Sequence, residues 1–338
     1  MKVDFHTYAG EVKALDGVAF DIKKGEAFGL VGESGCGKSV TALSIVGLLP
    51  GNATVTTGEI LFGNRNLLEI DHDEMRKVRA SKIAVVFQDP TTFLNPVFTI
   101  QQQLEEVFLL NPERVTAAAA DAEAKGTKPS LVTQLSTSRR ERAVKSLCKD
   151  VLSQVRLPET ILKEYPHELS GGMKQRCMIA MALARNPELL IADEITTALD
   201  VTIQAQILEL LRDLKRQLIG STLLITHDLG IVAEVCDRVG VMYAGNVVET
   251  AGVMELFANP LHPYTQGLMR AIPMIGREKE KLETIPGAVP DLINPPSGCR
   301  FHPRCSFAFE KCKLTKPELI QVGKDHTVAC HLYGVEKP

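Results

Sequence analysis

One stretch of the 338-residue sequence decides the fold: AFGLVGESGCGKS, residues 27–39. Its first five residues are apolar or small and predict a buried strand, and residues 32–39 fit the phosphate-binding pattern G-x-x-x-x-G-K-[ST]. Glycines let the backbone N–H groups of such a loop close around phosphates, and the following helix directs the positive end of its dipole at them. The stretch therefore predicts a nucleotide-binding α/β domain, with a helix running from the loop to Leu49.

The pattern also assigns chemical roles within the loop. Lys38 is expected to reach the β- and γ-phosphates of ATP, and the Ser39 hydroxyl is expected to bind Mg²⁺. Cys36 occupies a free position of the pattern and receives no separate role. The other positions expected to line the nucleotide are Gly32, Ser34, Gly35, Gly37 and Val40.

An apolar run that ends in two acids follows later in the chain. Residues 189–194 read LLIADE, the pattern called Walker B, in which Asp193 binds Mg²⁺ and Glu194 polarises the attacking water. Taken alone, such a run is usually structural. Its place after a phosphate-binding loop in the same α/β pattern favours the catalytic interpretation.

A third motif, LSGGMKQR at residues 169–176, separates this chain from other nucleotide hydrolases. It precedes an expected helix over 173–185, so Ser170, Gly171 and Gly172 would form a second anion site at a helix N-terminus. A domain with two phosphate-binding ends can enclose ATP by pairing head to tail with another such domain. The motif thus predicts a dimer of ATPase domains.

Together the three motifs resemble those of the ABC ATPases, whose P-loop fold combines a mixed sheet core with a helical subdomain. The resemblance implies that Gln88 contacts Mg²⁺ and the attacking water, that Asp200 acts across the dimer, and that His227 contacts the γ-phosphate. Tyr8 is the candidate to stack on adenine. The implied activity is Mg²⁺-dependent ATP hydrolysis, with Glu194, His227 and Gln88 as catalytic residues.

Three further segments, residues 89–96, 259–265 and 298–305, resemble the ATPases of oligopeptide and dipeptide permeases, and the likeness covers nearly the whole chain. It implies an importer of peptides. Its other parts would be a second, homologous but non-identical ATPase forming a heterodimer, two transmembrane permease subunits and an extracytoplasmic substrate-binding protein. Relatives carry oligosaccharides or nickel, and both are alternatives for the cargo. A soluble ABC ATPase acting on DNA or ribosomes is a further alternative, although such proteins carry two cassettes or long coiled coils.

Composition limits the class of protein. Apolar residues make up 45%, charged residues 23%, and the formal net charge is −3, which indicates a globular protein without the basic footprint of nucleic-acid binding. No apolar run reaches the roughly 18 to 20 residues needed to span a bilayer, and residues 1–13 lack the apolar segment of a secretory signal. The chain is therefore expected at the cytoplasmic face of the membrane, attached through partner subunits.

The order of elements predicts the domain organisation. Strands are expected over 12–31 with turns at Gly17 and Gly25, and over 58–63, 82–87, 189–192, 221–226 and 238–243. Strands that alternate with helices predict a mainly parallel sheet. We expect an ABC nucleotide-binding domain over 1–252, with a helical subdomain at about 89–186, and a small cysteine-bearing domain over 253–338 that begins with a proline-rich linker.

Three features depart from the family pattern. Ile195 stands where the family usually has proline after the Walker B glutamate, so this turn is less fixed in φ. The sequence begins where relatives already have a first strand, so that strand is expected to be missing or shortened. Residues 111–138 are rich in alanine, threonine and serine with little periodicity, and are expected to form a mobile insertion that is longer than usual in the family.

Four cysteines gather near the C-terminus with the spacing Cys299-x₅-Cys305-x₆-Cys312-x₁₇-Cys330. In an intracellular protein such a cluster favours metal binding over disulfides. Structural zinc sites prefer close C-x₂₋₄-C pairs, so the wider spacing favours a [4Fe–4S] cluster, with zinc or four unligated thiols as the alternatives. The resemblance to permease ATPases, among which this tail carries such a cluster, implies the same. His302 and His331 are further ligand candidates, and a structural role is expected.

Overall fold

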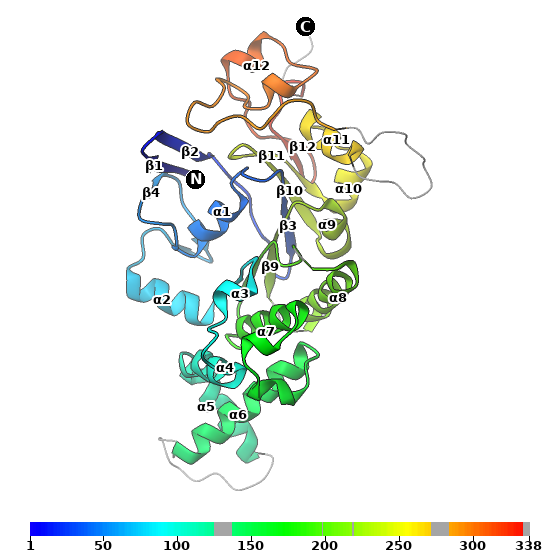
Figure 1. The fold of residues 1–338 in the computed structure, drawn as a ribbon. Helices are drawn as coiled ribbons and strands as arrows, with labels where there is room; N and C mark the ends of the chain where they lie inside the picture. The colour runs from blue at the N-terminus through cyan, green and yellow to red at the C-terminus, as the bar shows by residue number, and fades with distance from the viewer. Residues whose placement is uncertain (125–136, 198, 218–219, 272–283, 334–338) are drawn as a thin grey trace. The chain divides into compact units, whose positions relative to one another are not determined.

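The computed structural model describes residues 1–124, 137–197, 199–217, 220–271 and 284–333 (Figure 1). They divide into two compact units. The first comprises Met1–Asp71 and Leu223–Pro338, and the second comprises His72–Thr222. Each unit is considered by itself below.

A mixed sheet forms the centre of the first unit, with strands in the order β12-β13-β11-β10-β3-β9. Its strands are β12 (Ile320–Gly323), β13 (His326–Val328), β11 (Asn246–Gly252), β10 (Arg238–Tyr243), β3 (Ala27–Val31) and β9 (Ser221–Thr226). β10 pairs in parallel with β3 and antiparallel with β11, which in turn pairs antiparallel with β13. The expected strands over 27–31, 221–226 and 238–243 are confirmed, and a C-terminal hairpin extends the sheet.

A second, antiparallel sheet has the order β2-β1-β4, with strands Gly10–Asp16, Lys2–Thr7 and Ala53–Thr57. The first strand is not missing, because β1 pairs along its length with β2. The expected strand beyond Gly17 is wrong, since residues 17–26 lie outside any strand. Phe20 there stacks on Phe28 at 5.1 Å, so apolar alternation reflects packing and not a hydrogen-bonded ladder.

Among the described residues, the remaining pieces of this unit are a small hairpin, five α-helices and a 3₁₀-helix over His302–Arg304. The hairpin joins β5 (Leu61–Phe62) to β6 (Arg65–Asn66), within and just past the strand expected over 58–63. The helices are α1 (Lys38–Ile45), α9 (Leu229–Val235), α10 (Val253–Ala258), α11 (Pro263–Arg270) and α12 (Glu310–Leu314). α1 ends four residues earlier than the sequence predicts.

The segment after Gly252 packs into the core of the first unit. Tyr264 from α11 and Phe301 share a buried cluster with Val31 of β3 and with Val241 and Tyr243 of β10. Figure 1 shows α9 and α10 beside this sheet. The expectation of a linker is therefore wrong at α10 and α11, where Tyr264 is buried in the core and Pro263 begins a helix. Residues 284–299 lie outside helices and strands.

The second unit carries most of the helices. They are α2 (His72–Ser81), α3 (Pro90–Phe93), α4 (Ile100–Leu109), α5 (Pro112–Ala124), α6 (Thr137–Gln154), α7 (Gly171–Leu183) and α8 (Val201–Gln217). Two strands, β7 (Ile83–Val86) and β8 (Leu189–Asp193), pair in parallel and confirm the strands expected there. None of the described helices is both long and apolar enough to cross a membrane.

Part of the insertion expected over 111–138 is helical. Residues 112–124 form α5, which begins with proline at its first position and continues with alanines of high helix propensity. Val115 and Ala119, four residues apart on one face, are buried. Residues 125–136 lie outside the described residues.

Candidate nucleotide site and cysteine pocket

The phosphate-binding loop leaves the end of β3 and enters α1. Lys38 is 4% exposed, and its Nζ donates to the carbonyl oxygens of Gly32 at 2.8 Å and Glu33 at 3.1 Å. At Gly32 a Cβ would lie 2.1 Å from the carbonyl oxygen of Met242, so only glycine fits. The loop is thus pressed against the end of β10, with its lysine folded along its own backbone.

The other loop residues differ in exposure. Ser34, Gly35 and Ser39 are exposed, Gly37 and Val40 are half-buried, and Cys36 is buried. Burial raises the pKa of the Cys36 thiol against the opposing effect of Lys38, so the thiol is protonated at neutral pH. Cys36 therefore acts as a packed side chain, with its carbonyl accepting from Gly245 N–H at 2.8 Å.

Two more predicted nucleotide contacts lie in the first unit. His227 is exposed directly after β9, which neighbours β3 in the sheet. The next residue, Asp228, caps α9 by accepting from Gly230 N–H at 2.7 Å. Tyr8 is fully exposed in the turn between β1 and β2. The roles of His227 and Tyr8 stay predictions.

The Walker B acids lie at the end of β8 in the second unit. Asp193 is 6% exposed. Glu194 has φ of 48°, a left-handed conformation that costs a non-glycine residue about 1–3 kcal/mol and concentrates at functional sites. Ile195, at the position of the family's proline, is buried. Packing of Ile195 therefore restrains the turn where a proline ring is absent.

Gln88 emerges near these acids within the second unit. Val86 of β7 pairs with Ala192 of β8, and the two strands are parallel. Gln88, two residues past Val86, therefore leaves the same edge as Asp193 and Glu194. Its side chain is exposed, so it is accessible to a bound metal or water.

The third motif occupies the start of α7, two residues earlier than the sequence predicts. Ser170 is the N-cap, accepting from Met173 N–H at 3.4 Å, and is exposed. Gly171 beside it is also exposed. At Gly172 a Cβ would lie 2.6 Å from Cγ2 of Ile203 on α8. This glycine therefore permits close packing of α7 on α8. The sequence predicted Gly172 only as part of an anion site.

Asp200 lies at the start of α8, where its Oδ1 accepts from Ile203 N–H at 2.9 Å. The carboxylate is exposed. Its observed contact is that of a helix cap. The role across a dimer that the family resemblance implies stays a prediction.

The four C-terminal cysteines line one small pocket in the first unit, together with three histidines. The lining cysteines are Cys299, Cys305, Cys312 and Cys330, and the histidines are His262, His302 and His331. Within the described residues, no group of three or more His, Cys, Asp or Glu side chains is arranged to hold a metal ion. The structure thus brings the predicted cysteines together without a preformed coordination site for a single ion.

Burial controls the protonation of groups in this pocket. It raises the pKa of Cys299 to about 11 and that of Cys330 to about 11, so both are thiols at neutral pH. Burial lowers the pKa of His262 to about 3, and its Nδ1 accepts from Tyr264 N–H at 3.0 Å. His262 was not among the predicted site residues, although its place before Pro263 is typical of a helix start.

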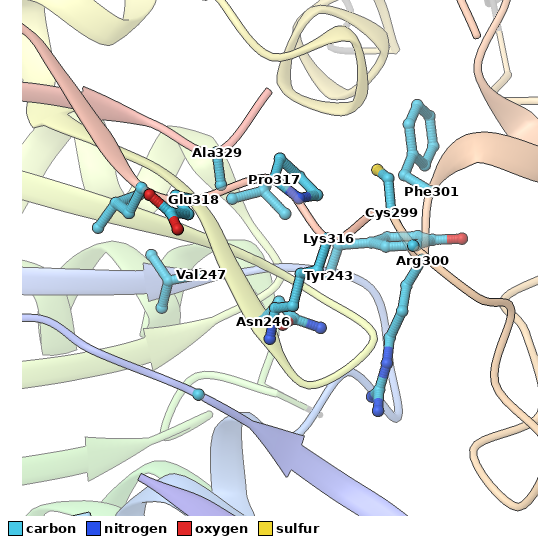
Figure 2. A pocket seen from close by; sticks show the side chains of 14 residues that line it. Tyr243, Asn246, Val247, Cys299, Arg300, Phe301, Lys316, Pro317, Glu318 and Ala329 are labelled. Carbon is cyan, nitrogen blue, oxygen red and sulfur yellow. The ribbon is translucent and has the colours of Figure 1, made fainter. Parts of the chain in front are cut away.

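A larger cavity of about 420 Å³ is lined by Arg300 and by Cys299 and Phe301, which also line the small pocket (Figure 2). Figure 2 shows the side chains of Cys299 and Arg300 extending in opposite directions. Arg300 donates to the carbonyl oxygens of Ala244 at 2.6 Å and Lys13 at 3.0 Å. Arg300 therefore ties the cysteine segment to the strands beside the phosphate-binding loop.

Comparison with known proteins adds to this geometry. The sequence profile of the family described as "ABC transporter" matches residues 15–197, and that described as "Oligopeptide/dipeptide transporter, C-terminal region" matches residues 248–312. Among curated relatives, "Probable peptide ABC transporter ATP-binding protein y4tR" of Sinorhizobium fredii is 49% identical, over 97% of this chain and 92% of its own. "Oligopeptide transport ATP-binding protein AppD" of Bacillus subtilis is 47% identical, over 99% and 96% of the two chains.

A solved structure agrees with the fold. The ATP-binding cassette MJ0796, described as a dimeric post-hydrolysis state bound to ADP and Pi, is 28% identical, with a TM-score of 0.59. The match covers 75% of this chain and 96% of that one. The likeness supports the P-loop fold of an ABC ATPase.

Proposed function

The chain belongs to the ABC transporter family of ATP-binding proteins, and on that premise we propose that it powers the import of short peptides from the cytoplasmic face of the membrane. The main support for peptides as the cargo is the match of residues 248–312 to the C-terminal region of oligopeptide and dipeptide transporters. The names of the relatives at 46–49% identity agree with it. Oligosaccharides and nickel are the alternative cargoes, and a soluble ABC ATPase is the alternative outside transport.

Each motif has a different role in ATP hydrolysis. Lys38 binds the β- and γ-phosphates and Ser39 binds Mg²⁺, which Asp193 holds from the Walker B strand. Glu194 orients the attacking water, and its left-handed backbone supports that role. Gln88 contacts Mg²⁺ and the attacking water.

The other assignments concern recognition of the nucleotide. His227 contacts the γ-phosphate, and Tyr8 stacks on adenine. The fully exposed ring of Tyr8 leaves its face available for such a contact.

The active assembly contains two such ATPases arranged head to tail. The exposed Ser170 cap, with Gly171 and Gly172, faces the phosphates held by a second, homologous subunit, and Asp200 acts across the same interface. The described dimer of MJ0796 supports pairing of this fold. Two permease subunits and an extracytoplasmic substrate-binding protein complete the importer.

The cysteine pocket is proposed to hold a [4Fe–4S] cluster on Cys299, Cys305, Cys312 and Cys330. The support is that all four line one pocket and that their wide spacing suits a cluster better than one ion. Zinc is the alternative. The cluster would supply folding free energy to the C-terminal region.

A transport assay with the assembled importer tests whether the cargo is a peptide. Membrane vesicles that contain both ATPases and the permease subunits, with the substrate-binding protein outside, should accumulate a labelled dipeptide or oligopeptide only when ATP is enclosed. The variant Lys38→Ala should abolish uptake. Accumulation of an oligosaccharide or Ni²⁺ in place of every peptide would reject the peptide assignment.

A further inference from the structure

Glu33, the second residue of the phosphate-binding loop, is held at its backbone and its side chain. Its N–H donates to the hydroxyl of Tyr264 at 3.0 Å. Its carboxylate pairs with Arg304 through contacts of 2.7 and 3.1 Å. Its carbonyl accepts from Lys38 Nζ at 3.1 Å. One loop residue therefore connects the phosphate-binding lysine to two side chains of the C-terminal region.

The guanidinium of Arg304 is fixed in place. Its side chain is 6% exposed, and it also donates to the carbonyls of Pro286 at 2.9 Å and Ile285 at 3.2 Å and to the hydroxyl of Tyr243 at 3.4 Å. With the two contacts to Glu33, each of the five N–H donors of a guanidinium has an acceptor. A two-point pair of this kind sets the orientation of the carboxylate as well as its distance.

Tyr264 is equally restrained. It is fully buried at the start of α11, and its ring packs on Tyr243 at 4.6 Å and on Phe301 at 5.4 Å between centroids. The hydroxyl that meets the loop is therefore fixed by an aromatic cluster of the core. A rigid acceptor from one side and a rigid cation from the other leave Glu33 little freedom.

This restraint bears on phosphate binding because the loop binds through its backbone N–H groups. The next two residues, Ser34 and Gly35, are exposed, and a Cβ on Gly35 would meet nothing within 4 Å. The tip of the loop thus has little packing of its own. The apparent Kd for a ligand is inversely proportional to the fraction of molecules in the binding conformation.

We propose that Arg304 and Tyr264 are positioning residues that hold the loop at Glu33 in its phosphate-binding conformation, so that the C-terminal region sets the affinity of this chain for nucleotide. The proposal rests on nucleotide binding by the loop. It gives the C-terminal region a role in the ATPase site that is separate from cargo and from metal.

Titration of the purified full-length chain with a fluorescent ATP analogue in the presence of Mg²⁺ tests the proposal. If loss of the pair lowers the population of the binding conformation to about one tenth, Arg304→Ala raises the Kd about tenfold. Arg304→Lys keeps the charge but loses the two-point contact, so its Kd should lie between those of wild type and Arg304→Ala. Glu33→Gln and Arg304→Gln should be non-additive, because each removes the same interaction.

The matched control is Asp325→Asn, which breaks a different ion pair between the C-terminal region and the rest of the unit. Asp325 pairs with Lys23 at 2.8 Å on the exposed surface, so this variant should bind within about twofold of wild type. Wild-type affinity in Arg304→Ala and Glu33→Gln, or additive effects of the two Gln variants, would overturn the proposal. Unchanged binding by Lys38→Ala would instead reject the nucleotide site itself. If Arg304→Ala fails to fold, Arg304→Lys and Glu33→Gln decide the matter.

Discussion

Asp16, at the end of β2, lies with its Oδ2 2.9 Å from the Nζ of Lys316, 300 residues later in the chain. Lys2 Nζ contacts the other carboxylate oxygen at 2.9 Å, and Arg300 lies 3.7 Å away. Burial acts to raise the pKa of Asp16, but hydrogen bonds from Lys316 and Lys2 outweigh it and hold the pKa at about 2. A single carboxylate thus joins the N-terminal sheet to the cysteine-bearing segment.

Stability should therefore depend on pH through Asp16. Its folded pKa is below the unfolded value, so its contribution is complete above about pH 4 and is lost as the pH falls toward 2. The contribution of Asp16 to the free energy of unfolding is at most about 2 kcal/mol at neutral pH. Burial lowers the pKa of Lys316, and this cost reduces the net contribution of the ion pair. In urea unfolding, the difference between wild type and Asp16→Asn should roughly halve between pH 7 and about pH 3.

Asp73→Asn is the control for this prediction, since Asp73 forms an exposed pair with Arg76 at 3.5 Å. It should change the free energy of unfolding little at any pH. A difference between wild type and Asp16→Asn that stays constant with pH would show that the carboxylate contributes through shape and not through charge.

The buried carboxylate of Glu249 should be essential to the fold of the C-terminal region. It is 0% exposed and accepts from the N–H groups of Leu261 and His262 at 2.8 and 2.9 Å and from His326 Nε2 at 2.8 Å. Glu249→Ala leaves these donors unsatisfied and should lower the free energy of unfolding by about 3–5 kcal/mol. Denaturant unfolding measures the loss.

Glu255→Ala is the matched control for Glu249→Ala. Glu255 approaches the same histidine, with Oε1 3.7 Å from His326 Nδ1, but is 54% exposed. Its removal should change stability by less than about 0.5 kcal/mol. Equal effects of the two variants would contradict the importance given to burial.

Metal content tests the cysteine pocket. Chain purified without oxygen should be brown and contain about four iron and four sulfide ions. Ser in place of any of Cys299, Cys305, Cys312 or Cys330 should remove the colour and destabilise the C-terminal region, whereas Cys236→Ser, outside the pocket, should keep it. A colourless chain with one zinc would support the alternative, and a chain without metal would exclude both.

The exposed cap of α7 should matter only in the assembled ATPase pair. Ser170→Ala should leave the nucleotide affinity of the isolated chain unchanged and lower ATP hydrolysis by the complete transporter, because the proposed contact is to the nucleotide of the partner subunit. Ser153→Ala, on the exposed face of α6, serves as control. Full hydrolysis by a strictly monomeric chain would contradict the head-to-tail arrangement.

The local motifs were predictable because their chemistry fixes their spacing. The phosphate loop after β3, the acids at the end of β8 and the start of α7 all follow from short patterns that combine apolar runs with glycine or acid. Buried strands also gave clear signals, since a continuous apolar run with both faces covered has few alternatives.

Elements that depend on distant pairing gave no comparable signal. β13 has three residues and is stabilised by β11, some 80 residues earlier in the chain. The polar strand β1 likewise depends on β2 and β4. The contact of Glu33 with Arg304 joins residues 271 positions apart, and neither residue has a pattern that specifies the other. Tertiary packing supplied what local propensity could not.

Glu194→Gln gives the most direct test of the ATPase mechanism. The variant keeps the shape of the side chain but cannot orient water as a carboxylate does, so ATP hydrolysis by the assembled transporter should fall at least about 100-fold. ATP binding should persist, and the two ATPase subunits should remain closed together with ATP bound. Near-normal hydrolysis by Glu194→Gln would contradict the catalytic role assigned to the acid that follows β8.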